Sequence, residues 1–158
     1  MKFNTAVQAL VDSGVEFIII GGWSAVLHGS STLTNDLDIF FPRHPENLRR
    51  LVEALKPFHP RLRGLPADLP FIFDDTTLRN GTVFTLTTDV GDIDLLAEVS
   101  GLDSFNKVQA AAVTVDAFGR NVRTLDLKSL IQAKRAAGRD KDLRTLPELE
   151  SLLEAEER

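Results

Sequence analysis

Apolar residues recur with helical spacing in some segments of the chain and in short continuous runs in others. Residues 4–13 and 45–56 place their apolar positions three and four apart, which predicts two amphipathic helices. Residues 15–20 form a short β-branched run that ends at a glycine pair, which is typical of a buried strand, and a short helix should follow to Gly29. Residues 36–41, DLDIFF, predict the next strand.

The second half of the pattern mixes hairpins with helices. A short helix is expected over 74–79, and two strands joined by a turn over 81–99. Residues 112–125 predict a second hairpin, and residues 127–137 and 140–155 predict two closing helices. This order favours an α/β (α+β) fold: a mixed, mostly antiparallel sheet of about five strands flanked by helices, with a helical C-terminus.

The chain length limits the number of domains. A chain of 158 residues is long enough to bury one core and too short for two independent cores. Four of the seven prolines fall within residues 57–70, which predicts an irregular surface segment inside the domain. We therefore expect a single domain over residues 1–158, with the C-terminal helices of residues 126–155 packed on it.

Composition and charge exclude several classes of protein. The 43% hydrophobic and 26% charged residues exclude wholesale disorder, and the lack of cysteine excludes disulfides, thiolate zinc sites and a cysteine nucleophile. The net charge of −5 argues against a protein that coats nucleic acid. Because no apolar run has the length of a leader or a membrane span, we expect a cytoplasmic protein without membrane contact.

Positive charge is concentrated in two segments. Residues 43–63 carry six Lys/Arg against two Glu, and residues 120–144 carry eight against three Asp. Aspartates cluster in other parts of the chain. Two basic segments could therefore flank an acidic centre.

Two aspartates interrupt the apolar run of residues 36–41. Because side chains alternate along a strand, Asp36 and Asp38 project to the same side. Carboxylates this close repel each other unless a cation bridges them or one stays protonated, and Mg²⁺ prefers carboxylates together with substrate phosphates. The pair indicates a metal site, and two capping residues that face water are the alternative.

A glycine pair precedes this strand. Gly21 and Gly22 lie between a strand and a helix, where backbone amides and the positive helix end can meet a phosphate, and Ser24 adds a hydroxyl. A simple strand-to-helix turn is the alternative for the glycines taken alone. The order of strand, glycine turn, helix and Asp-x-Asp strand predicts an anion-binding turn beside metal-binding carboxylates.

A second Asp-x-Asp pair, Asp92 and Asp94, occurs in GDIDLLAEV, on a strand that could pair with the first. Two-metal phosphoryl chemistry needs about three carboxylates, which hold ions roughly 3.5–4 Å apart. Asp94 is the preferred third ligand, because apolar residues flank it as they flank Asp38. Asp92 follows Gly91, and for it we favour the alternative that it only closes the turn.

Charged residues also lie on the apolar stripes of the two C-terminal helices. Lys134 shares one stripe, and Asp142 begins the next. Inward charges are costly unless paired, so an ion pair between the two helices is one interpretation. In the functional interpretation, Lys134 reaches a nucleotide's phosphates, Asp142 positions the lysine or acts on the acceptor, and Arg139 contacts an anion.

These motifs resemble the nucleotidyltransferase superfamily that shares a polymerase-β-like palm. GGWSAVLHGSSTLTNDLDIFF is similar to its opening motif, a glycine turn followed about a dozen residues later by Asp-x-Asp, and IDLL looks like its third-carboxylate strand. LIQAKRAAGRDKDLRTLPEL looks like the helical motif of small bacterial stand-alone members related to abortive-infection-type toxins.

The resemblance implies a nucleotidyltransferase-like fold and a set of residue roles. The cofactor would be two Mg²⁺ ions, with Mn²⁺ as an alternative. Thr32 departs from the family pattern, which often has an arginine a few residues before Asp-x-Asp, and Arg43 or Arg79 could substitute. The implied catalytic metal ligands are Asp36, Asp38 and Asp94, and the implied nucleotide-binding residues are Gly21, Gly22, Ser24 and Lys134, supported by Asp142, Arg139 and Asp92.

The sequence thus predicts a Mg²⁺-dependent nucleotidyltransferase that moves an NMP from an NTP to an acceptor hydroxyl on RNA such as tRNA, on a protein or on a small molecule. A role in a toxin–antitoxin system is part of this prediction. The alternative is a catalytically degenerate binding or regulatory module that acts with an antitoxin or another partner protein, which the short chain and Thr32 favour. A third interpretation is an α/β domain whose aspartates only cap strands.

Overall fold

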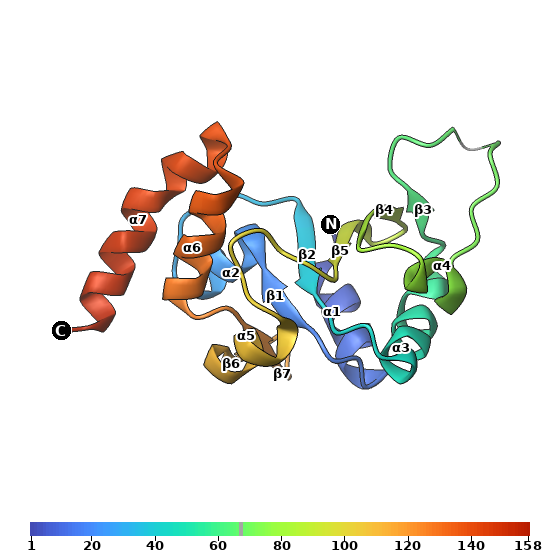
Figure 1. The fold of residues 1–158 in the computed structure, drawn as a ribbon, viewed down its shortest axis with the longest axis horizontal. Coiled ribbons are helices and arrows are strands. Elements are labelled where there is room, and N and C mark those ends of the chain that lie inside the picture. Colours follow the sequence, from blue (N-terminus) through green and yellow to red (C-terminus); the bar gives the residue numbers. More distant parts are fainter. Residues whose placement is uncertain (67) are drawn as a thin grey trace.

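A seven-stranded mixed sheet forms the centre of the computed structural model, which describes residues 1–66 and 68–158 (Figure 1). The strand order is β3-β4-β5-β2-β1-β7-β6. Four neighbouring pairs are antiparallel, and two, β2 with β5 and β1 with β7, are parallel. The strands are β1 Ile18–Ile20, β2 Asp36–Phe40, β3 Arg61–Leu62, β4 Val83–Thr88, β5 Gly91–Leu96, β6 Val113–Ala117 and β7 Arg120–Thr124.

The predicted fold class is confirmed, whereas the described residues form seven strands and not about five. The missed element is β3, which lies in the proline-rich segment that was predicted to be irregular. Arg61 and Leu62 pair antiparallel with Thr87 and Leu86 of β4, so this segment supplies the edge of the sheet. Two residues are too few to show the alternation by which a strand is recognised in a sequence.

Seven α-helices and one 3-10 helix surround the sheet in the described part of the chain. They are α1 Phe3–Asp12, α2 Gly21–Leu27, α3 Pro45–Leu55, η1 Lys56–Phe58, α4 Asp75–Arg79, α5 Phe105–Ala111, α6 Leu127–Ala137 and α7 Asp140–Glu156. All the predicted helices are present; α5 was not predicted, and α2 begins at Gly21 itself. None of the helices in residues 1–66 and 68–158 combines the length and the apolar character that crossing a membrane requires.

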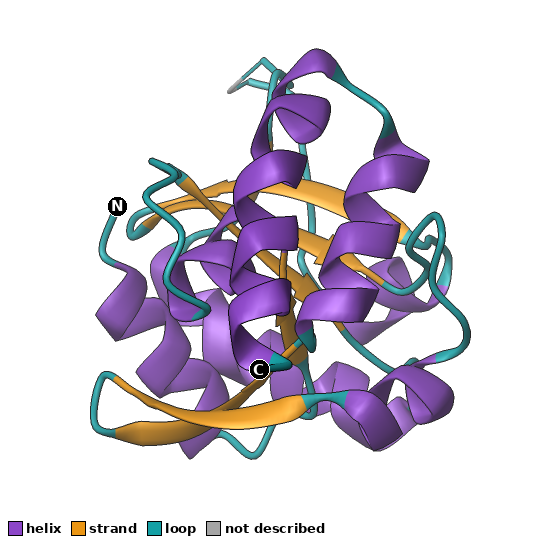
Figure 2. Ribbon diagram, turned by 90° about the vertical axis from the view of Figure 1, so that its left-hand side faces the viewer, coloured by secondary structure: helices purple, strands orange, loops and turns teal. Residues whose placement is uncertain are grey.

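The sheet buries a different core on each face. Because side chains alternate, Ile19 joins the core under α1 and α3, whereas Ile18 and Ile20 join the core under α5, α6 and α7. Figure 2 shows the two C-terminal helices upright in front of the strands. Asp38 lies opposite Ile20 in the antiparallel pairing of β1 with β2, so the aspartates of β2 share the face that α6 and α7 cover.

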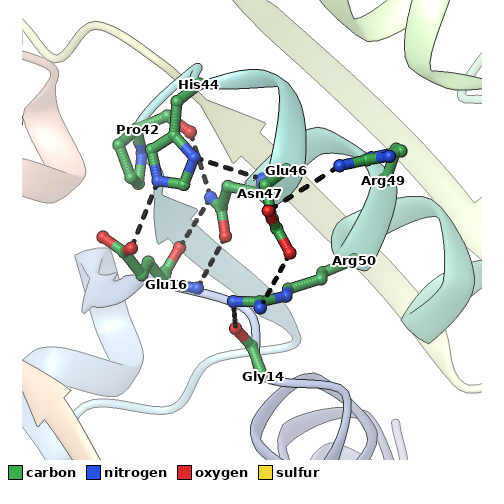
Figure 3. Close-up of polar contacts among 8 residues, drawn as sticks. All are labelled: Gly14, Glu16, Pro42, His44, Glu46, Asn47, Arg49 and Arg50. Atoms are coloured by element: carbon green, nitrogen blue, oxygen red, sulfur yellow. Dashed lines mark hydrogen bonds and ion pairs between the residues drawn. The ribbon is translucent and has the colours of Figure 1, made fainter.

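A fully buried asparagine ties α3 to the strands that carry the site (Figure 3). The Asn47 side chain accepts a hydrogen bond from the backbone N–H of Glu16 (2.7 Å) and donates to the carbonyls of Glu16 (3.1 Å) and Pro42 (3.0 Å). Glu16 leads into β1, and Pro42 follows β2. One amide thereby fixes the start of one strand and the end of the next.

Candidate active site

Four aspartates lie side by side on the central strands. The parallel pairing of β2 with β5 places Asp36 opposite Asp92 and Asp38 opposite Asp94. The prediction that the two Asp-x-Asp strands pair is confirmed. Asp92 therefore does more than close a turn, because it lies beside Asp36 on the face below the C-terminal helices.

Asp38 lies in an environment that disfavours its negative charge. Burial, together with the charges of Asp94 and Asp36, raises its pKa to about 7 from the ordinary 3.8. Its Oδ1 atom is buried and finds no hydrogen-bond partner among the described residues. An unsatisfied buried carboxylate oxygen costs free energy, so this atom is available to a cation.

Arg63 contacts the same cluster from the segment after β3. Its Nη2 atom lies 2.8 Å from Oδ1 of Asp94 and also donates to the carbonyl of Leu86 (2.8 Å), while its Nε atom lies 3.4 Å from Oδ2 of Asp92. No sequence pattern signals this contact, because Arg63 lies in the proline-rich segment, 31 residues before Asp94. The arginine contributes the positive charge on this side of the carboxylates.

A second charged cluster joins α6 to α7. Lys134 Nζ lies 3.3 Å from Oδ1 of Asp142, and Arg139 Nε lies 2.7 Å from Oδ2 of Asp142. Asp142 is fully buried, and burial alone would raise its pKa, but the hydrogen bond from Arg139 and the charge of Lys134 together lower it. The predicted ion pair between the two helices is confirmed, and the carboxylate holds both cations in place.

The two clusters face each other across a cleft. Two cavities of about 240 Å³ each form it, one reaching Asp94 and Asp142 and the other reaching Asp36, Lys141 and Arg144. The lining residues that the two cavities share are Gly21, Asp38, Lys134 and Arg139. The cleft is therefore acidic on the sheet and basic on the helices.

Gly21 and Gly22 line this cleft, and both lack room for a side chain. A Cβ atom on Gly21 would lie 2.4 Å from Oδ2 of Asp38, and Gly21 has a φ of +67°, which favours glycine. A Cβ atom on Gly22 would lie 2.7 Å from Oγ1 of Thr34. The glycine pair thus lets α2 begin directly against the Asp-x-Asp strand, and its role in phosphate binding stays a prediction.

Ser24 points away from the cleft. Its side chain is fully buried, and its hydroxyl lies 2.6 Å from that of Thr124, which donates to the carbonyl of Ile19 (2.9 Å). The orientation of Ser24 removes the basis on which it was predicted as a phosphate ligand. In the short helix α2, the position of a residue along the turn decides whether its side chain enters the core or the cleft.

Thr32 lines the cleft. Arg43 and Arg79, which were suggested as substitutes for the arginine that the resemblance leads us to expect before Asp-x-Asp, do not line it. The Thr32 hydroxyl lies 2.7 Å from that of Ser30. Arg43 instead donates to the carbonyl of Arg79, which itself pairs with Asp75. The cations that do line the cleft come from the later basic segment and include Lys134 and Arg139.

The carboxylates suit a hard cation in their chemistry. They are oxygen donors in adjacent register, and one of them has an unsatisfied buried oxygen. In their present positions, no three His, Asp or Glu side chains of residues 1–66 and 68–158 form a group that could hold a metal ion. The predicted metal ligands Asp36, Asp38 and Asp94 are nonetheless neighbours, with Arg63 against the last of them.

The fold has counterparts among solved structures, although no protein-family model and no curated protein sequence matches the chain. A provisionally assigned nucleotidyltransferase from Thermotoga maritima superposes with a TM-score of 0.59 at 16% identity, over 92% of this chain and 88% of that one. An antigenic nucleotidyltransferase-like protein from Paracoccidioides brasiliensis gives a TM-score of 0.52 at 16% identity, over 94% of this chain and 74% of that one. The chain therefore shares its fold with these two proteins.

Proposed function

We propose that the chain is a Mg²⁺-dependent nucleotidyltransferase that moves a nucleoside monophosphate from an NTP to an acceptor hydroxyl. The observation that carries this proposal is the cleft in which the paired carboxylates of β2 and β5 face the cations of α6 and α7. A metal–nucleotide complex needs both sides, because carboxylates bind the metal and cationic side chains bind the polyphosphate. The nucleotidyltransferase-like fold supports the same conclusion.

Each side of the cleft has its own role in this proposal. Asp36, Asp38 and Asp94 would hold Mg²⁺, which when bound supplies charge neutralisation at the reacting phosphate. Lys134 and Arg139 bind the outer phosphates and orient the α-phosphorus toward the acceptor. The acceptor hydroxyl attacks the α-phosphorus and releases its proton to solvent. The bond between the α-phosphorus and the oxygen that bridges to the β-phosphate breaks, and pyrophosphate leaves on the basic side.

Asp142 acts in the same proposal as a positioning residue. It does not have to touch the nucleotide, because its two oxygens already hold Lys134 at 3.3 Å and Arg139 at 2.7 Å. Lys141 and Arg144 extend the basic side of the cleft beyond this pair. These cations lie on the side of the cleft where the triphosphate would bind. The acceptor of this proposal is a hydroxyl on RNA, on a protein or on a small molecule.

Incubation of the purified chain with each NTP, radiolabelled at the α-phosphate, together with Mg²⁺ and a cell extract tests the proposal. We expect label to pass to an acceptor with the wild type and to be lost with Asp36→Asn. Asp116→Asn is the matched control, because Asp116 is exposed on β6 at the far edge of the sheet. Equal labelling by the two variants, or no labelling with any NTP, contradicts the proposal.

A second candidate is a module that binds nucleotide without turnover and acts through a partner protein such as an antitoxin. The contact of Arg63 with Asp94 favours it, because a guanidinium already neutralises the third carboxylate. Calorimetric titration with NTP and Mg²⁺ separates the two candidates. Binding that Asp36→Asn weakens, without label transfer from any NTP, identifies the module.

A further inference from the structure

Two polar atoms within the carboxylate cluster lack hydrogen-bond partners among the described residues. One is Oδ1 of Asp38, and the other is Nε of Arg63, which lies 3.4 Å from Asp92 without completing a hydrogen bond. Unsatisfied buried donors and acceptors are rare in a finished structural ion pair, because each one costs free energy. The contact of Arg63 with the aspartates therefore lacks the complete hydrogen bonding that is typical of a permanent structural ion pair.

The guanidinium contacts a carboxylate that the proposed function assigns to the metal ion. Its Nη2 atom approaches Oδ1 of Asp94 to 2.8 Å, and Asp94 is the neighbour of Asp38 in the strand register. A guanidinium and a divalent cation at one carboxylate repel each other, and the repulsion is stronger where water is excluded. Occupation by the one therefore opposes occupation by the other.

The backbone of Arg63 is held independently of its side chain. The residue follows the two-residue edge strand β3, and its backbone N–H donates to the carbonyl of Thr85 (2.9 Å), so the backbone stays anchored when the side chain turns. The side chain is 32% exposed, and on its other flank Gly64 has open space around its Cβ position. A rotation of the side chain toward solvent would free Asp94 and the carbonyl of Leu86 while the backbone hydrogen bond to Thr85 stays in place.

We propose that Arg63 is an internal competitor for the cation site. In the nucleotide-free protein the guanidinium neutralises Asp94 and Asp92, and it leaves Asp94 when the divalent cation binds with the nucleotide. The cluster is thereby stabilised without a metal, and free cation binds weakly until a nucleotide adds its own ligands. This inference rests on the proposed function, since it assigns regulation to the same carboxylates.

Calorimetric titration of the full chain with Mn²⁺ alone tests the competition without an activity assay. We expect Arg63→Gln to bind Mn²⁺ roughly tenfold or more tightly than the wild type, because one positive charge beside the carboxylates is removed. Arg61→Gln is the matched control, since it removes the same charge from an exposed position on the same edge strand. Its affinity should stay within about twofold of the wild type.

A second variant keeps the test decisive if Arg63→Gln melts at a much lower temperature. Arg63→Lys retains the charge but not the forked geometry, and we expect it to bind Mn²⁺ with an affinity between those of the wild type and Arg63→Gln. Unchanged or weaker binding by both Arg63 variants, or no binding by any variant, overturns the competition. If Arg63→Gln and the wild type bind Mn²⁺ equally and label transfer is intact, the competition is refuted and the proposed function stands. If Arg63→Gln binds Mn²⁺ more tightly but no label is transferred, the proposed function is refuted and the competition stands.

Discussion

Asp38 lies directly beside Asp94 in the parallel pairing of β2 with β5, and burial together with this neighbouring charge raises the pKa of Asp38 to about 7. In the unfolded chain the same carboxyl titrates near its ordinary value of 3.8. The folded protein therefore binds this proton more tightly than the unfolded chain does. Linkage then requires that the protonation of Asp38 stabilises the folded protein fully below about pH 4. This stabilisation is lost as the pH rises to about 7.

Asp38→Asn should stabilise the protein in alkaline solution, because an amide cannot acquire the unfavourable charge. At pH 8 in EDTA we expect the free energy of unfolding to rise by up to about 4 kcal/mol, whereas at pH 4 the variant and the wild type should be similar. Urea denaturation followed by the fluorescence of Trp23, the single tryptophan, measures both values. If Asp116→Asn, at an exposed carboxyl, has the same effect at pH 8, the account of Asp38 is wrong.

Local geometry explains why the sequence predicts part of this site. Alternation along a strand depends only on neighbouring residues, so it places Asp36 and Asp38 on one face whatever the rest of the fold. The spacing of Lys134 and Asp142 on their helices is local in the same way, and their ion pair follows once the two helices pack together. Both pairs of residues are therefore recognisable from the sequence alone.

The rest of the site depends on contacts between distant segments. The register that sets Asp38 against Asp94 arises from the pairing of β2 with β5, which the sequence only allowed. Arg63 reaches the cluster because β3 joins the edge of the sheet, and a two-residue strand shows no periodicity. Ser24 carries the right chemical group for a phosphate, but the rotation of α2 turns it toward Thr124.

Gly21→Ala should be more destabilising than Gly119→Ala, because only the first of these two glycines lacks room for a Cβ atom. Both Gly21 and Gly119 adopt this backbone conformation, with φ of +67° and +75°, which costs an alanine about 1–2 kcal/mol. Only at Gly21 does the new Cβ atom also meet Asp38, at 2.4 Å, and overpacking of this kind adds roughly 1–3 kcal/mol. Urea denaturation of the two variants isolates the contact, and equal losses would show that the Asp38 side chain moves aside freely.

In the ion pair between α6 and α7, loss of Asp142 should lower the free energy of unfolding more than loss of Lys134. Asp142→Asn leaves Lys134, whose side chain is 13% exposed, without its carboxylate, and we expect a loss of about 3 kcal/mol in the free energy of unfolding. Lys134→Met leaves Asp142 its bond to Arg139, so we expect a smaller loss of about 1 kcal/mol. Lys128→Met, in an exposed pair with Glu157, is the control and should change stability by less than about 0.5 kcal/mol. Guanidinium denaturation gives the order, and a larger loss for Lys134→Met would contradict it.

Asn47→Ala should destabilise the whole fold while leaving the chemistry of the cleft intact, because α3, which carries Asn47, packs on the other core from the one under α6 and α7. The change removes three hydrogen bonds and leaves the N–H and C=O of Glu16 and the C=O of Pro42 without their partner. We expect a loss of roughly 2–4 kcal/mol in the free energy of unfolding. The control, Glu46→Ala, removes only exposed ion pairs on the same helix and should lose less than about 1 kcal/mol. Below its melting temperature, Asn47→Ala should bind Mn²⁺ with the affinity of the wild type. A variant that keeps its stability, or that alters Mn²⁺ binding while still folded, would show that the amide does not anchor the two strands independently of the site.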